Sequence, residues 1–402
     1  MRSRKVLFIS PTPTHPSNAG NRQHIKSLVS FFKEQNWEVH FLYLAYEEYG
    51  ENEMRSFFGD NLYIITKSDL FQSRKTFEYV LKEIKTVISK QIRKLQFFSG
   101  SITNDQLKYN NEVDSYFSVF IKPKIKALQK KYRFRAVVCE YAYLSKSLTF
   151  FDKGVLKIID THDRFTDRFQ SYLDNNLQPA WISLFKAQER KALRRADVVL
   201  AVNKEDAGYF SNMSGAKTAV FNYVPAVLSL PQKALEKRLL YIASDNVINL
   251  ATIQLFIKNI FPLILQKHPE ATLIIGGSIC KKLKADDRNI VLHGTVEELK
   301  SFYALGDVVI NPETRGTGYK VKAIEALSFG MPMVATKAGA VGVTDPWQDH
   351  LLIGESPEEF ANCVDLLFSN PELLKQTSTN AHNWILNYKT NMKESLVSVL
   401  SV

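Results

Sequence analysis

The sequence is poor in cysteine. Cys139, Cys280 and Cys363 are the only three among 402 residues, and no two of them form a C-x-x-C pair. This excludes a disulfide-built secreted domain and a structural zinc site made of closely spaced cysteines. Each cysteine lies in an apolar or helical pattern, so we expect buried, reduced thiols in a cytoplasmic protein.

Long apolar runs are missing as well. The basic N-terminus has an apolar run of about six residues, which is too short for a signal-peptide core and predicts a first β-strand. No later window reaches about 18 uninterrupted apolar residues, the length that a membrane-spanning helix needs. The pattern predicts a protein that is soluble or lies on a membrane surface.

Negative charge is in deficit. Lysine and arginine total 52 against 41 aspartates and glutamates, which gives a formal net charge of +11. Such a surplus suits nucleic acid, anionic lipid or phosphorylated small molecules, and composition alone does not choose among them. Hydrophobic residues make up 45% of the chain, which is typical of a well-packed globular protein and, at this length, of two domains.

Short apolar runs alternate with helical patterns in two blocks. Strands are expected at 5–10, 38–44, 62–65, 136–139, 156–160, 198–202 and 217–221, and then at 239–243, 271–276, 289–293, 308–311, 332–335 and 350–353. The helical patterns are 22–32, 76–98, 112–131, 181–195, 250–265, 296–302 and 320–329. This alternation predicts an α/β fold of two doubly wound, Rossmann-like domains with their strand ends across a cleft.

The proline-containing stretch 225–237 separates the two blocks. We therefore expect one domain at 1–224, a linker at 225–237 and a second domain at 238–402. The segment from 371 onward is expected to be helical and is a candidate to cross back to the first domain.

Two loops in the first block carry polar residues after a strand. In "NAGNRQH", Gly20 precedes a helix N-terminus, which is the outline of an anion loop or of a plain turn. In "DTHDR", His162 can bond a sugar or a phosphate, carry a proton, or be a satisfied loop histidine. Asp160 and Asp163 beside it suit a metal site or a glycosidase site, but no further acid–histidine cluster in the sequence completes either.

The second block has three such stretches. "ASDNVINL" is a helix N-cap cluster in which Asn249 begins the helix, with ligand contact as the sharper alternative. Gly277 in "IIGG" allows close backbone approach to a flat ring, or simply a turn. In "RGTGYKVKAIE" glycines lead into a helix, Lys320 and Lys322 add positive charge, and Glu325 shares a face with Lys322. The alternative for the last pair is an ion pair on a solvated helix.

In combination these stretches resemble the GT-B glycosyltransferases, and within them the family-4-like enzymes that use nucleotide-sugar donors. The resemblance spans nearly the whole chain and is loosest over 47–131. It is carried by "NAGNRQH", "DTHDR", "ASDNVINL", "IIGG", "LHGTVEELKSFYALGDVVINP" and above all by "RGTGYKVKAIEALSFGMPMVATKAGAVGV".

The resemblance implies roles for particular residues. Lys322 would hold the donor diphosphate, Glu325 would accept hydrogen bonds from both ribose hydroxyls, and His162 would contact the donor sugar. These three are the expected catalytic residues. The other expected donor contacts are Gly20, Asn249, Gly277, Arg315, Gly316, Thr317, Gly318, Tyr319 and Lys320. The resemblance also implies a retaining transfer with no metal and no cofactor besides the donor, a UDP- or GDP-sugar.

One position departs from the common family pattern. That pattern has two glutamates with seven residues between them; Glu325 matches the second, and Thr317 stands in place of the first. The first glutamate usually contacts the donor sugar, so its replacement puts the identity of that sugar in doubt. A subset of the family has this form, and we do not interpret it as inactivation.

A basic amphipathic pattern at 77–98 bears on the acceptor. Such a helix can lie on an anionic membrane and favour a lipid-linked acceptor, or it can be a core-facing helix with a solvated basic face, which is slightly favoured. Residues 121–135 add further basic charge.

The sequence thus predicts a glycosyltransferase of the cytoplasm, or peripheral on the inner face of the plasma membrane. It would extend a glycan or lipid-linked saccharide in cell-surface polysaccharide or glycolipid biosynthesis. The first domain would take the acceptor and the second the nucleotide-sugar. Alternatives are a GT-B nucleotide-sugar epimerase or hydrolase, and a non-enzymatic basic binding module. No nucleic-acid partner is expected, since no recognised nucleic-acid motif occurs.

Overall fold

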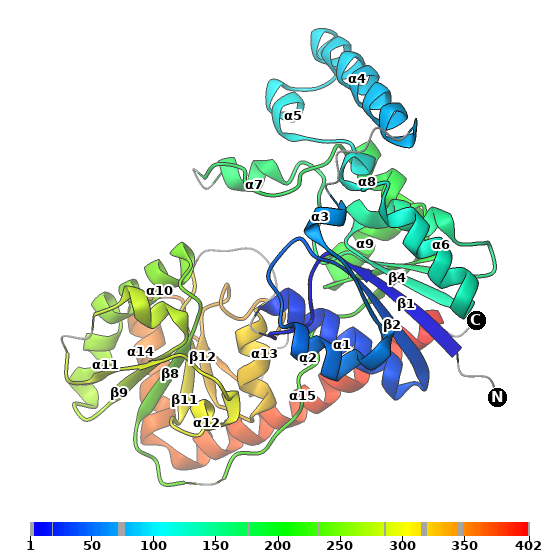
Figure 1. The fold of residues 1–402 in the computed structure, drawn as a ribbon. Helices are drawn as coiled ribbons and strands as arrows, with labels where there is room; N and C mark the ends of the chain where they lie inside the picture. Colours follow the sequence, from blue (N-terminus) through cyan, green and yellow to red (C-terminus); the bar gives the residue numbers. More distant parts are fainter. Residues whose placement is uncertain are drawn as a thin grey trace. The chain divides into compact units, whose positions relative to one another are not determined.

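The computed structural model describes residues 4–17, 19–70, 77–174, 177–231, 233–284, 287–314, 320–343 and 349–400. The chain divides into two compact units, Met1–Tyr223 with Met392–Val402, and Val224–Asn391 (Figure 1).

A parallel sheet of seven strands forms the centre of the first unit, as far as this unit is described. Its order is β3-β2-β1-β4-β5-β6-β7, and each neighbouring pair runs parallel. The inner strands are runs of Val, Ile and Leu that are buried on both faces, as parallel sheets require. The strands are β1 (Arg4–Ser10), β2 (Trp37–Leu44), β3 (Leu62–Ile65), β4 (Ala136–Glu140), β5 (Leu156–Asp160), β6 (Val198–Ala201) and β7 (Lys217–Val220).

Helices connect these strands and cover the sheet. They are α1 (Gly20–Glu34), α2 (Glu51–Phe58), α3 (Lys67–Leu70), α4 (Phe77–Phe98), α5 (Asn104–Tyr109), α6 (Ile121–Tyr132), α7 (Phe169–Leu173), α8 (Lys186–Leu193) and α9 (Lys204–Ser214). The end of the last helix, α15 (Pro371–Leu400), also belongs to this unit. There the backbone N–H of Val220 donates to Ser395 Oγ at 3.1 Å, and Lys393 Nζ lies 2.5 Å from a Glu34 carboxylate oxygen.

The second unit repeats this plan with six parallel strands in its described part, in the order β10-β9-β8-β11-β12-β13. They are β8 (Arg238–Ile242), β9 (Thr272–Gly276), β10 (Ile290–Gly294), β11 (Val308–Asn311), β12 (Met333–Ala335) and β13 (Leu352–Ile353). Its helices are α10 (Val247–Asn259), α11 (Phe261–Lys267), α12 (Leu299–Tyr303), α13 (Val321–Ser328), α14 (Pro357–Ser369) and most of α15.

The strand orders show where ligands can bind. In each sheet the order reverses at one point, between β1 and β4 in the first unit and between β8 and β11 in the second. Ligands of open α/β sheets bind beyond the carboxyl ends of the strands at such a point. The two doubly wound sheets confirm the predicted fold class.

Several predicted helices have different limits, and proline explains two of the differences. The pattern at 112–131 gives a short 3-10 helix at Val113–Tyr116 and then α6, which begins two residues before Pro123. The pattern at 250–265 divides into α10 and α11 just before Pro262. Proline lacks a backbone N–H and is tolerated only in the first turn of a helix, so each helix restarts beside it.

One stretch, Val247–Lys267, is long and apolar enough to cross a membrane by length and composition. It corresponds to α10 and α11 together, and a third of its most apolar window is buried inside the unit. Core helices of soluble domains pass the same test.

Candidate active site

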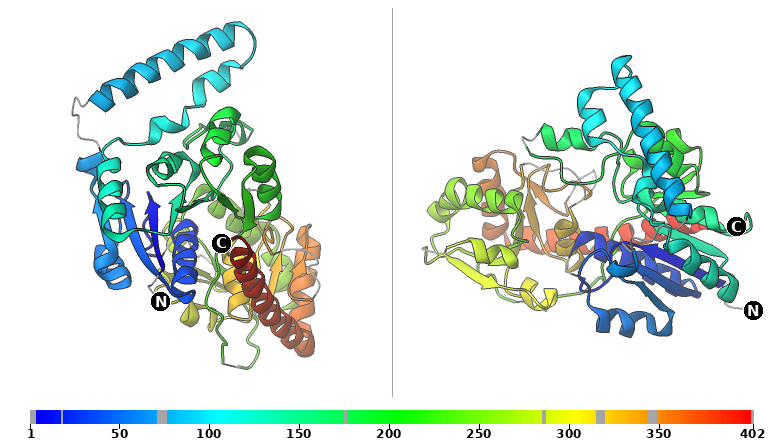
Figure 2. Two further views of the ribbon diagram at one scale, coloured as in Figure 1. Left: turned by 90° about the vertical axis from the view of Figure 1, so that its right-hand side faces the viewer. Right: turned by 45° about the horizontal axis from the view of Figure 1, so that its top comes forward.

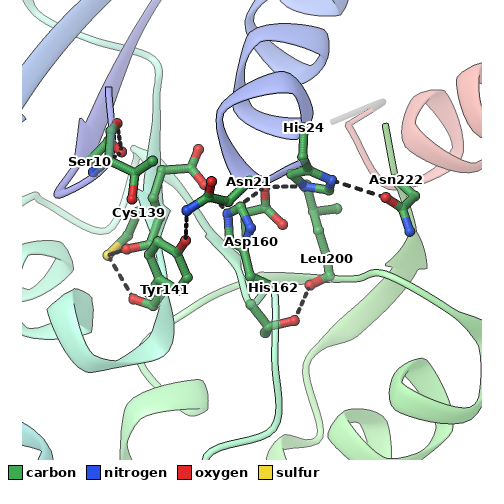
Figure 3. Close-up of polar contacts among 12 residues, drawn as sticks. Ser10, Asn21, His24, Cys139, Tyr141, Asp160, His162, Leu200 and Asn222 are labelled. Atoms are coloured by element: carbon green, nitrogen blue, oxygen red, sulfur yellow. Dashed lines mark hydrogen bonds and ion pairs between the residues drawn. The ribbon is translucent and has the colours of Figure 1, made fainter. Parts of the chain in front are cut away.

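In the first unit, four titratable side chains meet at the point where the strand order reverses. Glu140 and Asp160 are the last residues of β4 and β5 and lie opposite each other in register. His24 reaches them from α1, and His162 follows β5 (Figure 3). Burial is nearly complete for this group, which we call the histidine cluster.

Hydrogen bonds join the members of the histidine cluster. His24 Nε2 lies 2.7 Å from Asp160 Oδ2, and His162 Nε2 lies 2.8 Å from Glu140 Oε2 and 3.6 Å from Asp160 Oδ2. The other ring nitrogen of His24 lies 3.4 Å from Asn222 Oδ1 (Figure 3).

His162 and Tyr141 both have positive φ angles, +59° and +66°. Such angles are uncommon for residues other than glycine, and they cluster at functional sites where surrounding structure holds them. The two rings stack with centroids 4.2 Å apart, and the Asn21 amide donates to the Tyr141 hydroxyl at 3.2 Å. These contacts hold the His162 ring in one orientation.

Burial and mutual charge shift the pKa values of all four groups in the histidine cluster. Burial, joined by the negative charge of Asp160, raises the pKa of Glu140 well above its usual range. Burial opposes the charge on Asp160, but His24 and His162 outweigh it and lower the pKa of Asp160. The pKa of His24 is raised because Asp160 outweighs burial, whereas burial lowers the pKa of His162 to about 3. These pKa shifts favour the charged forms of His24 and Asp160 and the neutral forms of Glu140 and His162.

This cluster also has the residue types of a metal site. Ligand atoms of His24, Asp160 and His162 lie within 4.8 Å of one another. Ligands of a tetrahedral zinc ion would be about 3.3 Å apart, because zinc–nitrogen bonds are about 2.0 Å long. The contacts of 2.7 and 2.8 Å are direct hydrogen bonds, whereas Glu140 Oε1 and Asp160 Oδ1 are buried without a hydrogen-bond partner among the described residues. That the activity needs no metal stays a prediction.

In the second unit, two lysines meet beyond the ends of β8 and β11. Lys320 Nζ lies 2.6 Å from Glu313 Oε1, and this pair is almost fully buried. Lys322 Nζ lies 3.8 Å from Glu313 Oε2, donates to Asn249 Oδ1 at 3.1 Å and sits 5.2 Å from the centre of the Tyr241 ring. We call these groups the lysine cluster.

Charge pairing distinguishes the two lysines. Lys320 has a close carboxylate partner, whereas Lys322 shares that carboxylate at a longer distance. Burial and the charge of Lys320 outweigh Glu313, so the pKa of Lys322 is lowered. An anion at the start of α13 would therefore relieve the cost of burying the Lys322 ammonium.

Glu325 lies one turn along α13 from Lys322 and is 7% exposed. The helix forms here because Ala323, Ile324 and Leu327 bury an apolar face, and Gly330 just beyond it has a φ of +66°. Arg315, Gly316, Thr317, Gly318 and Tyr319, all predicted donor contacts, lie outside the described residues.

Three further predicted residues, Gly20, Asn249 and Gly277, have roles in the structure of the unit that contains each. Gly20 is the first residue of α1 and begins the helix that carries His24. Asn249 bridges its own loop to Lys322, because its amide also donates to Ser244 O at 3.0 Å. Gly277 has a φ of +98°, and a Cβ there would lie 2.2 Å from the carbonyl oxygen of Ala243, so the fold alone requires glycine.

The sequence interpretation did not assign a role to several residues of these clusters. Glu140 and Glu313 were missed, although each comes at or just after the end of a strand. Asn222 and Tyr241 carried no signal in the sequence. Their contacts join segments up to 198 residues apart.

Comparison with known proteins gives a family match in the second unit. Residues 236–370, in the second unit, match the family model described as Glycosyl transferases group 1. A curated relative, the "Uncharacterized 44.6 kDa protein in cps region" of Klebsiella pneumoniae, is 25% identical over 148 residues. This match covers 34% of the chain and 38% of the relative, so the chain spans less than two fifths of that relative's length.

Solved structures resemble nearly the whole chain. Alr3699/HepE of Anabaena, solved with UDP and glucose, has a TM-score of 0.63 at 13% identity over 99% of both chains. The pneumococcal O-GlcNAc transferase GtfA, solved with UDP and GlcNAc, has a TM-score of 0.63 at 12% identity over 100% of this chain and 99% of its own. Sucrose-phosphate synthase of Thermosynechococcus elongatus has a TM-score of 0.62 at 13% identity over 99% and 98%.

At such identities the solved structures establish the fold, and the family model adds the identity of the second unit. The predicted GT-B fold and the predicted glycosyltransferase domain are therefore confirmed. The chain has the GT-B fold of two Rossmann-like domains, and its residues 236–370 match the glycosyl transferases group 1 family.

Proposed function

We propose that this protein transfers a sugar from a nucleotide diphosphate, UDP or GDP, to a glycan or a lipid-linked saccharide. The observation that carries the proposal is the incompletely paired, partly buried ammonium of Lys322. It lies in the first turn of α13, directly after the segment 315–319 and beside the point where the strand order of the second unit reverses. A diphosphate supplies the negative charge that such a position favours.

Four residues of the second unit have a part in donor binding, three at the donor or its lysine and one by positioning the helix. Lys322 binds the diphosphate, and Asn249 orients the ammonium by accepting its hydrogen bond. The Glu325 carboxylate accepts hydrogen bonds from the ribose hydroxyls, for which an acceptor-only group is suited. Lys320 is already paired with Glu313 and acts mainly by holding the start of α13 in place.

The transfer breaks the bond between the anomeric carbon and the diphosphate oxygen, and the electron pair leaves with the diphosphate. Lys322 and the backbone N–H groups stabilise the charge that develops there. The acceptor hydroxyl attacks from the same face, and its proton passes to the departing diphosphate, so configuration is retained. His162 contacts the donor sugar, and the protein needs no metal for these steps.

Known proteins support the kind of donor and the setting. HepE and GtfA are described in complexes with UDP together with glucose or GlcNAc, and the Klebsiella relative is encoded in a cps region. We therefore favour a UDP-sugar donor and a role in cell-surface polysaccharide or glycolipid synthesis. Such a protein would work at the cytoplasmic face of the membrane.

The test is a nucleotide-release assay. Purified protein is incubated with UDP- and GDP-sugars, with and without a pool of lipid-linked and free saccharides, and the free nucleotide and sugar products are measured. Transfer predicts release that depends on acceptor and a new glycosidic product. Release of free sugar at the same rate without acceptor would indicate a hydrolase and contradict the proposal.

A further inference from the structure

Helix α4 turns its apolar face outward. Six large apolar side chains between Ile84 and Phe98 are between 50% and 80% exposed: Ile84, Val87, Ile88, Ile92, Leu95 and Phe98. At 100° per residue they occupy one continuous arc of the helix, about 140° wide. We call this set the α4 face. Figure 1 and the left view of Figure 2 show α4 standing away from the sheet of its own unit.

The opposite side of α4 holds the helix in this orientation. Arg93 lies about 180° around the helix from Ile84. Its guanidinium is 2.7 Å from a Glu112 carboxylate oxygen, donates to the Asn110 carbonyl at 3.4 Å and lies over the Phe185 ring at 4.9 Å. Arg93 therefore ties its side of the helix to the unit, and the apolar side faces solvent.

Helix α6 is an internal comparison. It is also amphipathic and basic, yet its apolar residues Ile121, Ile125 and Leu128 are buried in the core of the first unit. The interpretation that is slightly favoured for 77–98 from the sequence, a core-facing helix with a solvated basic face, describes α6 instead. It is wrong for the described part of α4, where the apolar residues are exposed.

Charge indicates what covers the α4 face. Lys90 and Lys94 are exposed along one edge of it. Basic residues outnumber acidic ones along α4, where five lysines and arginines stand against Glu78 and Glu83, and 84–104 has no aspartate or glutamate. A twofold contact between two copies through this face would bring the same lysines to both sides, and like charges oppose such a contact.

We propose that α4 lies in the surface of a bilayer that contains anionic lipid. The α4 face enters the boundary between headgroups and acyl chains, and Lys90 and Lys94 contact lipid phosphates. Apolar burial and basic flanks are the two components of interfacial binding by an amphipathic helix. This inference concerns the first unit alone and does not depend on the donor chemistry of the second.

Sedimentation with vesicles tests the proposal. The full chain is mixed with vesicles of phosphatidylcholine containing about a third phosphatidylglycerol, and with vesicles of phosphatidylcholine alone. We expect binding to the mixed vesicles that weakens as salt is added, because exposed charges are screened. Replacing Lys90 and Lys94 by glutamine should weaken it about fivefold per lysine, which corresponds to about 1 kcal/mol each.

The apolar component has its own variant and a matched control. Ile88→Gln combined with Leu95→Gln should reduce binding at least about tenfold, because each side chain loses its apolar burial. Leu366→Gln changes a leucine of α14 that is 53% exposed and should leave binding unchanged. All these positions face solvent, so circular dichroism should show an intact fold.

Two results would overturn the proposal. One is equal sedimentation of wild type and the Ile88/Leu95 variant with mixed vesicles. The other is no vesicle binding by wild type, whether the protein stays a monomer or forms a dimer that this variant abolishes. Loss of nucleotide release with intact vesicle binding would contradict the proposed function and leave this inference standing.

Discussion

His162 Nε2 lies 2.8 Å from Glu140 Oε2, and this hydrogen bond ties together the carboxyl ends of β4 and β5. Because one ring nitrogen is used in this way, Nδ1 is the atom left for a ligand. Within the described part of the chain, no residue hydrogen-bonds it. With a pKa of about 3, the ring is neutral at physiological pH.

His162 is expected to act on the transferred sugar and not on the nucleotide. His162→Ala should lower kcat about 100-fold, the size of effect seen when one group that stabilises a transition state is removed. The affinity for the nucleoside diphosphate should stay within about twofold, because Lys322 and Glu325 lie in the other unit. Steady-state kinetics and calorimetry measure the two quantities. His382→Ala, on α15, is the control, and a parallel loss of nucleotide affinity in His162→Ala would disprove this division.

The histidine cluster should make stability fall as pH rises. The folded-state pKa values of Glu140 and His24 are raised, so both groups bind more protons folded than unfolded as pH rises above their usual values. Stability from these groups is present at low pH and is lost toward their raised pKa values. The depressed pKa of His162 has the opposite sign between about 3 and 6.5, where it offsets Glu140.

Glu140→Gln isolates this effect. The variant has no carboxyl to titrate at this position. Its unfolding free energy should therefore fall less steeply as pH rises above 6.5, by at most about 1.4 kcal/mol per pH unit. Denaturant unfolding of both proteins at several pH values measures the difference. Identical slopes in wild type and variant would show that the Glu140 carboxyl is already ionised in the folded protein.

Removing one partner of the buried Glu313–Lys320 pair should lower the free energy of unfolding much more than replacing both partners. Glu313→Gln leaves the Lys320 ammonium buried with no close carboxylate and should cost about 3 kcal/mol of unfolding free energy. Adding Lys320→Met should recover most of that loss, because two apolar or neutral groups need no ion partner. Denaturant unfolding of the two single variants and the double variant forms the cycle. If the double variant lost the sum of the unfolding free energies lost by the two single variants, Glu313 and Lys320 would not interact as described.

Lys322 should make donor binding sensitive to alkaline pH. Only the ammonium attracts a diphosphate, so affinity is lost as pH rises through the pKa of Lys322. That pKa is lowered by burial, so the loss should begin at a lower pH than for an ordinary lysine, whose pKa is about 10.4. Lys322→Arg keeps its charge and should bind with little change between pH 7 and 10. Binding constants for a nucleoside diphosphate across this range measure the effect, and matching profiles would exclude Lys322 from the site.

Much of the fold could be predicted from local pattern. All thirteen expected strands are present, since a buried parallel strand is a short Val/Ile/Leu run bounded by turns. The predicted helix limits were wrong where Pro123 and Pro262 lie inside a continuous apolar period. The period predicts the face of a helix but not where a missing N–H divides it.

The site was harder to predict. Lys322 and Glu325 were found because they lie three residues apart beside glycines, a local signal. Glu140 and Asn222 act through contacts with segments far along the chain, and no spacing reveals such contacts. The direction of the α4 face was also missed, because an amphipathic period does not say whether its apolar side meets core or solvent.

The most direct test of donor binding is calorimetric titration of the purified protein with UDP and with GDP, beside Glu325→Ala and the control Lys300→Ala. We predict that one of the two nucleotides binds, that Glu325→Ala removes this binding and that Lys300→Ala leaves it unchanged. Binding that is equal in all three proteins would contradict the assigned site. No binding of either nucleotide to wild type would contradict the proposed donor.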